Sequence, residues 1–366
     1  MNNLYDEMAG IIDESNGGSG GNGGLPPEDS TSYTTPYLPT GFSKVSGTSL
    51  STGLVIQDST GNQYVWVEVP KTAEVYPTAG LAITNFTDDE CTVIENDLHT
   101  YTSVYRNNTS YTDTWHADND SNTSTNNNTN WLSETSYNVA KKNMLKSVYQ
   151  NGGFYVGRYE TGIEVEASGA SATNRKSNPV ITQIPTEIPV IKANAYPYNW
   201  VTRTQAQSLA KNMEHGNKTS SLMFGVQWDL VLKYLETKNA ATQLELNTNS
   251  TKIGNYIINY WDITNTSAKY STDYGVSWLT CPYKKNSVKA ILLTTGADTS
   301  FEKMNIYDIA GNAWEWTLEY TSDPSKPCAL RGGFYNNDGS TTPASCRNSD
   351  MTTSNYAGPG FRVSLY

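Results

Sequence analysis

The chain has 366 residues, of which 37% are hydrophobic and 17% are charged, and it carries a formal net charge of −11. An acidic surface repels phosphate, so this charge argues against a nucleic-acid-binding protein. The apolar runs are too short to span a bilayer, and the first residues lack the basic and apolar regions of a secretory signal. The 9 Trp and 25 Tyr still supply enough apolar area for a sizeable core. We therefore expect a loop-rich globular protein with a polar surface.

The first 35 residues predict a tether. Residues 1–12 indicate a short docking helix whose apolar side chains share one face, and residues 13–35 indicate a Gly-rich linker. A docking peptide that attaches the chain to a larger assembly is one interpretation, and a frayed terminus is the other.

The following segment, to about residue 131, predicts a hairpin and then a polar insertion. Two apolar runs, 54–56 and 64–69, flank a polar turn that contains Gly61, which is typical of a β-hairpin. Residues 76–131 are interpreted as a polar surface insertion, because 106–130 are too polar to bury much area. Within it, Asp88–Glu90 indicate a solvated acidic loop.

Helical patterns follow the insertion. Residues 133–150 predict a helix that Gly152 ends. Thr202 and Gln205 predict a capping box at the start of the next helix, and 226–237 predict another. From there to residue 366 only short strands and turns are expected. Two helices followed by many short strands indicate an α+β fold rather than a parallel, doubly wound sheet.

The residue types that perform catalysis form no recognisable pattern. The chain has four cysteines and three histidines, and their scattered positions argue against a common zinc site and a catalytic triad. The cysteines are therefore interpreted as isolated thiols, and no catalytic residue is assigned.

The C-terminal sixty residues contain three ordered motifs: Gly311-Asn312-Ala313-Trp314-Glu315-Trp316, Arg331-Gly332-Gly333 and Gly360-Phe361-Arg362. In this order they resemble the formylglycine-generating enzyme and sulfatase-modifying-factor family, a variant of the C-type lectin fold. The resemblance covers about residues 150–366, and 36–75 more weakly. It implies one C-type lectin-like domain over 36–366, with two helices, many short antiparallel strands and long loops. The motif residues themselves are interpreted as the frame of that domain, with Arg331 and Arg362 pairing with carboxylates or carbonyls.

The enzymes of this family use two copper-binding cysteines between the second and third motifs. The matching positions here are near Asn337 and Thr342, and Cys346 is the one cysteine in the interval. One thiol cannot form the pair, so the chain is expected not to be an enzyme. An oxidase acting on sulfatase cysteines remains an alternative.

A second branch of the fold is similar to this chain: the variable proteins of diversity-generating retroelements. Their C-terminal patch is rewritten by adenine-directed mutagenesis, which turns Asn codons into many residue types but not Lys, Glu, Gln, Met or Trp. Every residue of 334–350 belongs to the permitted set. An ordinary polar loop is the alternative. The predicted ligand-binding residues, within a variable region 334–356, are Phe334, Tyr335, Asn336, Asn337, Asp338, Ser340, Thr341, Thr342, Ser345, Asn348, Asp350, Thr352, Asn355 and Tyr356. Of these, Tyr335, Asn336, Asn337, Asp338, Asn348 and Tyr356 are expected to point outward.

A calcium site is implied by the family resemblance alone. Family members hold a structural calcium at the first motif, which implies Asn312 and Glu315 as ligands here. Alternatively, Asn312 caps a turn and Glu315 pairs with an arginine. No Glu-Pro-Asn or Gln-Pro-Asp tripeptide is present, so calcium-bridged sugar binding is not expected, and no cofactor is required.

Together these features predict a non-catalytic protein that binds a protein or glycan receptor on a host or neighbouring cell. The expected location is a virion or cell exterior, reached without a classical signal peptide, and the role is that of a phage or cell-surface adhesin. A structural virion decoration protein is a further alternative.

Overall fold

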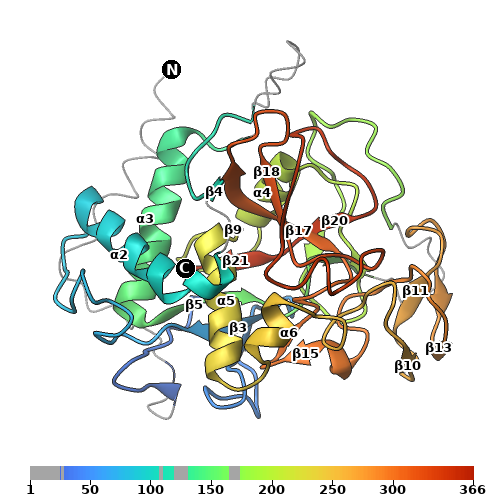
Figure 1. The fold of residues 1–366 in the computed structure, drawn as a ribbon, viewed down its shortest axis with the longest axis horizontal. Coiled ribbons are helices and arrows are strands. Elements are labelled where there is room, and N and C mark those ends of the chain that lie inside the picture. Colours follow the sequence, from blue (N-terminus) through green and yellow to red (C-terminus); the bar gives the residue numbers. More distant parts are fainter. Residues whose placement is uncertain (1–24, 26–28, 107–109, 119–130, 165–173) are drawn as a thin grey trace.

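The structure is a computed structural model that describes residues 25, 29–106, 110–118, 131–164 and 174–366. The predicted helix 1–12 and most of the predicted linker lie outside the described residues. The described part mixes helices with many short strands, mostly antiparallel, so the predicted α+β class is confirmed. Figure 1 shows α2 and α3 together on one side of the molecule, and β10, β11 and β13 on the opposite side.

The described residues form five α-helices rather than two. They are α2 (Asp88–Tyr101), α3 (Glu134–Asn151), α4 (Arg203–Lys211), α5 (Gly225–Thr237) and α6 (Gln243–Asn247), with 3₁₀ turns η2 (Ser103–Tyr105) and η3 (Thr299–Phe301). The predictions of α3, α4 and α5 are confirmed. Gly152 adopts a left-handed conformation with φ 69° at the end of α3, and the predicted capping box of Thr202 and Gln205 begins α4.

Two helix predictions were wrong. Asp88–Glu90 do not form a loop but the first turn of α2, where Thr87 and Glu90 form a capping box and the acidic side chains lie at the positive end of the helix dipole. Helix α6 follows α5 although no helix was expected there. Its five residues give too short a pattern for a hydrophobic period to be recognised.

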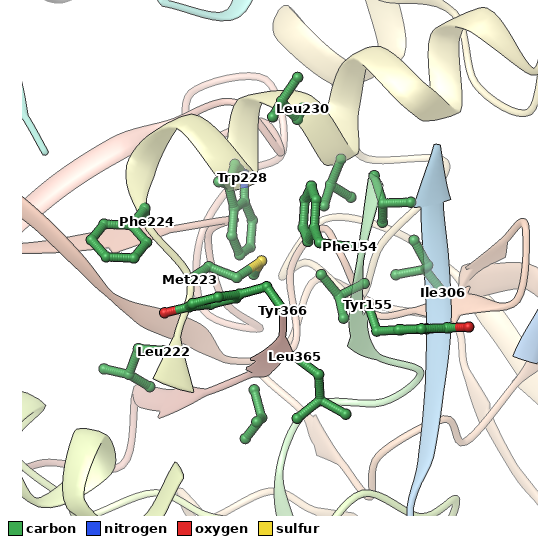
Figure 2. Packing of buried hydrophobic residues seen from close by; sticks show 14 of the residues in the cluster. Phe154, Tyr155, Leu222, Met223, Phe224, Trp228, Leu230, Ile306, Leu365 and Tyr366 are labelled. Atoms are coloured by element: carbon green, nitrogen blue, oxygen red, sulfur yellow. The ribbon is translucent and has the colours of Figure 1, made fainter. Parts of the chain in front are cut away.

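A six-stranded antiparallel sheet forms the centre of the core. The predicted hairpin is confirmed, because β2 and β3 pair in antiparallel register. The strands run in the order β1 (Ser43–Lys44), β2 (Val55–Gln57), β3 (Gln63–Glu68), β5 (Gly153–Gly157), β21 (Val363–Leu365) and β9 (Ser220–Leu222). A strand from the end of the sequence therefore lies between strands from its middle. Figure 2 shows Phe154 of β5, Trp228 of α5 and Tyr366 gathered around Met223 in this core.

A second sheet carries the three C-terminal motifs. Its order is β19 (Arg347–Asp350), β18 (Cys328–Arg331), β17 (Trp314–Thr321) and β20 (Pro359–Phe361), and β4 (Tyr111–Thr112) also pairs with β17. Strands β17 and β20 are parallel, and the other pairs are antiparallel. The motif segments, far apart in sequence, thus become neighbours on β17, β18 and β20.

Short strands complete the described fold. One sheet has β6 (Gly162–Ile163) between β7 (Pro189–Val190) and β8 (Tyr196–Pro197), and a second has β11 (Lys269–Ser271) between β12 (Leu279–Thr280) and β14 (Leu292–Leu293). Two further pairs are β10 (Trp261–Ile263) with β13 (Tyr283–Lys285), and β15 (Glu302–Lys303) with β16 (Ile306–Tyr307). Residues 261–301 bury a small apolar cluster of their own.

The predicted insertion 76–131 contributes to the core, which the sequence interpretation missed. Ile94 and Leu98 of α2 are fully buried in the main apolar cluster. The Asp113 carboxylate accepts hydrogen bonds from the backbone N–H groups of Gly225 and Val226 at the start of α5, and Asp118 pairs with buried Arg203. Polar composition hid this packing, because each buried carboxylate is matched by a donor from a distant element.

No helix in the described part of the chain is both long and apolar enough to cross a membrane. The four cysteines are free thiols, three of them buried and Cys346 half-buried, as their scattered positions predict.

Candidate ligand-binding face

Three buried arginines fix the strands around the interval 334–356. Arg331 ends β18, Arg347 begins β19, and Arg362 follows β20. The side chains of all three are almost completely enclosed. The predicted role of Arg331 and Arg362 in pinning the frame is confirmed, and Arg347 adds a third such contact from within the interval itself.

Arg331 and Arg347 share two carboxylates. Arg331 donates to Asp229 at 2.6 Å and to Glu319 at 3.3 Å, while Arg347 donates to Glu319 at 2.9 Å and also to Asp229. Burial by itself would raise the pKa of Glu319, but Arg347 and Arg331 outweigh it and lower that pKa below its usual value. We call these four residues the arginine–carboxylate hub. It joins α5, β17, β18 and β19 by charge-assisted bonds whose removal would leave buried, unpaired charges.

The proposed calcium ligands already have protein partners. Both carboxylate oxygens of Glu315 accept bonds from the Arg362 guanidinium, at 2.7 to 3.1 Å. The Asn312 oxygen accepts from the backbone N–H of Leu293 at 3.0 Å, and the Asn312 amide donates to Glu160 at 2.7 Å. The Asn312 oxygen also accepts from the Asn255 amide at 3.1 Å, so both of its lone pairs are used. The Arg362 guanidinium occupies both oxygens of Glu315, and Asn312 and Glu315 therefore do not fit a calcium ion in this arrangement.

The first loop of the interval runs from β18 to β19, and a glycine turn and the buried Tyr256 hold it in place. Gly332 and Gly333 have φ of 89° and 76°, and a Cβ at Gly333 would lie 2.7 Å from the Thr342 carbonyl oxygen, so the turn needs glycine. The Tyr256 hydroxyl bonds to the carbonyl oxygens of Gly332 and Thr342, at 3.0 and 2.9 Å. Two points of the loop that are ten residues apart, Gly332 and Thr342, are thus tied to one buried ring.

Asp338 organises the tip of this loop. Its side chain accepts from the backbone N–H and hydroxyl of Ser340, both at 2.8 Å, and its carbonyl oxygen accepts from the backbone N–H of Thr342 at 2.9 Å. Asn337 caps the adjoining turn, because its side-chain oxygen accepts from the Phe334 N–H at 3.3 Å. Asn337 and Asp338 are half-buried and shape the loop.

The second loop runs from β19 to β20 and meets the first at Gly358. A Cβ placed there would lie 2.6 Å from the Tyr356 ring and 3.3 Å from the Phe334 ring, so these two rings and this backbone are closely packed. Phe334 stacks in turn on Trp314 of β17, with ring centroids 6.3 Å apart. The two loops therefore share one aromatic base.

The predicted site residues differ in how far their side chains are exposed to solvent. Five side chains are exposed: Asn336, Ser340, Thr341, Asn348 and Tyr356. Six are half-buried: Phe334, Asn337, Asp338, Thr342, Asp350 and Asn355. Tyr335, Ser345 and Thr352 are buried, so they cannot be direct contacts without movement of the loops.

The prediction that Tyr335 points outward was wrong, because its side chain is only 1% exposed. The backbone N–H of Tyr335 bonds to the Asn312 carbonyl oxygen at 3.0 Å, which turns the ring inward against Phe334 and Tyr274. Burial, followed by nearby Tyr274 and Tyr356, raises the pKa of Tyr335 well above its usual value. Its hydroxyl is buried without a hydrogen-bond partner among the described residues.

Tyr274 is a candidate site residue that the sequence interpretation missed. It lies in the turn after β11, is 54% exposed, and its ring centroid is 6.3 Å from that of Tyr335. Tyr256, which holds the first loop, was missed as well. Neither lies near the C-terminal motifs in sequence, and only the folded chain brings them to the interval.

Comparisons with known proteins identify no family for this chain. No family model matches the chain, and no curated protein matches it. Among solved structures, the chain is similar to Treponema denticola variable protein 1, with a TM-score of 0.24 and 15% identity. The match covers 45% of this chain and 54% of that one, so the chain spans about half of that protein's length. A similarity at this level does not establish a common fold.

Proposed function

We propose that the chain is a non-catalytic receptor-binding protein, which presents the interval 334–356 on a C-type lectin-like frame. The observation that carries this proposal is the contrast within the interval: five exposed polar or aromatic side chains lie on β19 and the two loops beside it, and the arginine–carboxylate hub fixes that strand to the core. Tyr, Asn and Ser on a rigid support are the combination that antibody loops use for recognition.

The placement of the motifs supports the lectin-like frame. The first motif enters β17, the second ends β18, and the third lies on and after β20, and these strands are adjacent in one sheet. A shared frame of this kind leaves the loops between the strands free to vary, because their exposed side chains contribute little to the core.

Diversification by a retroelement is part of the proposal, and the geometry limits where it is tolerated. Arg347 and Ser345 lie inside the interval but are engaged with Asp229, Glu319 and Asn247. We expect sequence variants of the chain to keep these two positions while Asn336, Ser340, Thr341, Asn348 and Tyr356 vary. Sequencing the gene from a mixed population, together with the neighbouring DNA, would test this expectation.

Binding can be tested with the fluorescently labelled full-length chain on a panel of intact bacterial strains and on a glycan array. Replacing the five exposed side chains with Ala is expected to abolish binding to the strains or glycans that the unmodified chain labels. A matched control replaces five exposed side chains near the first sheet, Ser32, Tyr33, Thr35, Ser46 and Ser59, and is expected to bind normally. Equal loss in both variants would contradict the proposed face.

Tyr356 gives the sharpest single test, because a partly exposed ring among small polar residues is a typical anchor. Tyr356→Ala is expected to weaken binding by about tenfold or more, and Tyr33→Ala, the matched control at another exposed tyrosine, to leave it unchanged. A chain that labels no strain and no glycan, but is found in purified virions, would favour the decoration-protein alternative.

The absence of catalysis is also proposed. Incubation with copper and a Cys-x-Pro-x-Arg peptide is expected to yield no aldehyde, because Asn337 and Thr342 occupy the positions of the family's cysteine pair. Robust aldehyde formation would replace this proposal with the oxidase alternative. Display at a virion or cell surface, through the N-terminal segment, completes the proposed role.

A further inference from the structure

Three side chains of metal-binding type meet where α2 faces the segment after β4. Glu95 and His99 lie one turn apart on α2, and Asp113 directly follows β4. One ligand atom from each lies within 4.8 Å of the others, and His99 Nε2 is 4.0 Å from Glu95 Oε1. Asp113 comes from a separate element, so the fold brings it to the two α2 side chains.

This group differs from an ordinary acidic surface patch. Asp113 is 2% exposed, and the side chains of His99 and Glu95 are 20% and 14% exposed. His99 Nε2 is buried and has no hydrogen-bond partner among the described residues. A buried ring nitrogen without a partner is unfavourable, and a bond to a metal ion would satisfy it.

Asp113 is held in place by its own partners. Its two carboxylate oxygens accept from the backbone N–H groups of Gly225 and Val226, at 2.6 and 2.8 Å. Each oxygen keeps a second lone pair, so the carboxylate can bind a metal while α5 orients it.

Three cationic groups oppose a metal ion here: after burial, the charges of Arg106 and Arg347 lower the pKa of His99, and the third is Lys141 of α3, which contacts a candidate ligand directly. Its ammonium group lies 2.9 Å from Glu95 Oε2 and 2.8 Å from the Asp113 carbonyl oxygen. Two carboxylates and a neutral imidazole can neutralise a divalent cation, so the ion would displace the ammonium group from Glu95.

We propose that Glu95, His99 and Asp113 form a zinc site that ties α2 to the segment after β4. One imidazole nitrogen and two carboxylate oxygens suit Zn²⁺, whereas Ca²⁺ and Mg²⁺ prefer oxygen ligands alone. Ligand atoms around tetrahedral zinc lie about 3.3 Å apart, so the side chains of Glu95 and His99 must rotate toward the Asp113 carboxylate for the site to close. Water would fill the fourth position.

The test is a titration of the full-length chain with ZnCl₂ by isothermal calorimetry, alongside the visible spectrum with CoCl₂. We expect one equivalent of zinc and the absorption of tetrahedral cobalt. His99→Ala and Glu95→Gln should each weaken zinc binding by about 100-fold, since even the loss of an outer-shell partner costs about 10–100-fold. Lys141→Met, which removes the competing ammonium group, should strengthen binding.

His215 provides the matched control. Its ring also has a buried nitrogen without a hydrogen-bond partner among the described residues, but it belongs to no described group of three ligands. His215→Ala should therefore bind zinc like the unmodified chain. The proposal fails if the unmodified chain takes up no zinc, if His99→Ala binds it equally well, or if CaCl₂ binds as tightly as ZnCl₂.

Discussion

Tyr335 is buried, although the polar residues around it in the sequence indicate an exposed position. It lies between Phe334 and Asn336 in a polar interval, yet its ring packs inward and its hydroxyl has no partner among the described residues. Hydroxyls of this kind are rare in folded proteins because they lose water without gaining a bond. The position therefore combines packing that stabilises the face with a polar atom that weakens it.

Two substitutions separate these contributions. Tyr335→Phe keeps the ring and removes the unpaired hydroxyl, so the free energy of unfolding should stay equal or rise by about 1–3 kcal/mol. Tyr335→Ala leaves a cavity and should lower it by about 3 kcal/mol or more. Urea denaturation of both variants measures the difference. A substantial loss of stability in Tyr335→Phe would mean that the hydroxyl has a partner, such as ordered water.

Asp308 predicts a pH dependence. It is buried, has φ of 56°, and accepts a bond from the Gly296 N–H at 2.7 Å. Burial raises the pKa of Asp308 to about 7, against an opposing effect of Gly296 and Arg362. The folded state thus holds this proton more tightly than the unfolded state. Its contribution to stability is present below about pH 4 and is lost as the pH rises through about 7.

Asp308→Asn should therefore reduce the loss of stability between those pH values. Asn accepts the same bond and tolerates the left-handed conformation, so the backbone is not disturbed. Unfolding free energies across the pH range, compared between the two chains, isolate Asp308 from other buried carboxyls. Parallel curves for the two chains would show that Asp308 does not titrate in this range.

At the scale of elements, the arginine–carboxylate hub connects the candidate face to the core. Arg347→Met leaves Asp229 and Glu319 with only one guanidinium between them, and should cost about 3–5 kcal/mol. Arg347→Lys should not restore the loss, because Arg347 also donates to the Tyr105 carbonyl oxygen at 2.7 Å and one ammonium group cannot reach all three acceptors.

A solvent-exposed ion pair serves as the control for the hub. Lys284 and Asp262 are 3.5 Å apart and both side chains are more than half exposed. Lys284→Met should change stability by about 1 kcal/mol or less. If Arg347→Met were equally mild in urea denaturation, the hub would not be what fixes the loops.

The elements that sequence predicted well are those with local signals. The capping box at Thr202 and the turn around Gly61 depend on residues only a few positions apart, and both are where they were expected. Helix α2 escaped detection because its acidic first turn resembles a solvated loop, although the same residues cap a helix. The buried partners of Asp113 and Asp118 lie some 85 to 113 positions away in sequence, which no periodic pattern reveals.

The sequence predicted which interval forms the candidate site, but not which of its side chains face inward. The motifs marked the ends of the interval, and the exposed positions of Asn336, Asn348 and Tyr356 agree with that expectation. Which side chains face inward depends on contacts with Asn312 and Tyr256, and the contribution of Tyr274 depends on a turn some sixty residues earlier. These relations arise from tertiary packing alone.

At the scale of the whole molecule, the tether interpretation gives a further prediction. Deleting residues 1–24 should leave the free energy of unfolding within about 0.5 kcal/mol of its original value, because a Gly-rich segment buries little apolar area. Thermal and urea denaturation of the shortened chain check this. The shortened chain should also fail to join its assembly, and unfolding on deletion would contradict the tether interpretation.

The position of β21 has a consequence for how the protein is made. This strand lies between β5 and β9 in the central sheet, yet it is translated only after the whole interval 334–356. A nascent chain therefore cannot complete its sheet until the ribosome has read through every codon of the loops. A stop codon or frameshift introduced there would remove β21, leave β9 without a partner strand and β5 paired with β3 alone, and the product is expected to be degraded. Only variants of the interval 334–356 that keep the reading frame would include β21, so only those variants would fold and could be displayed.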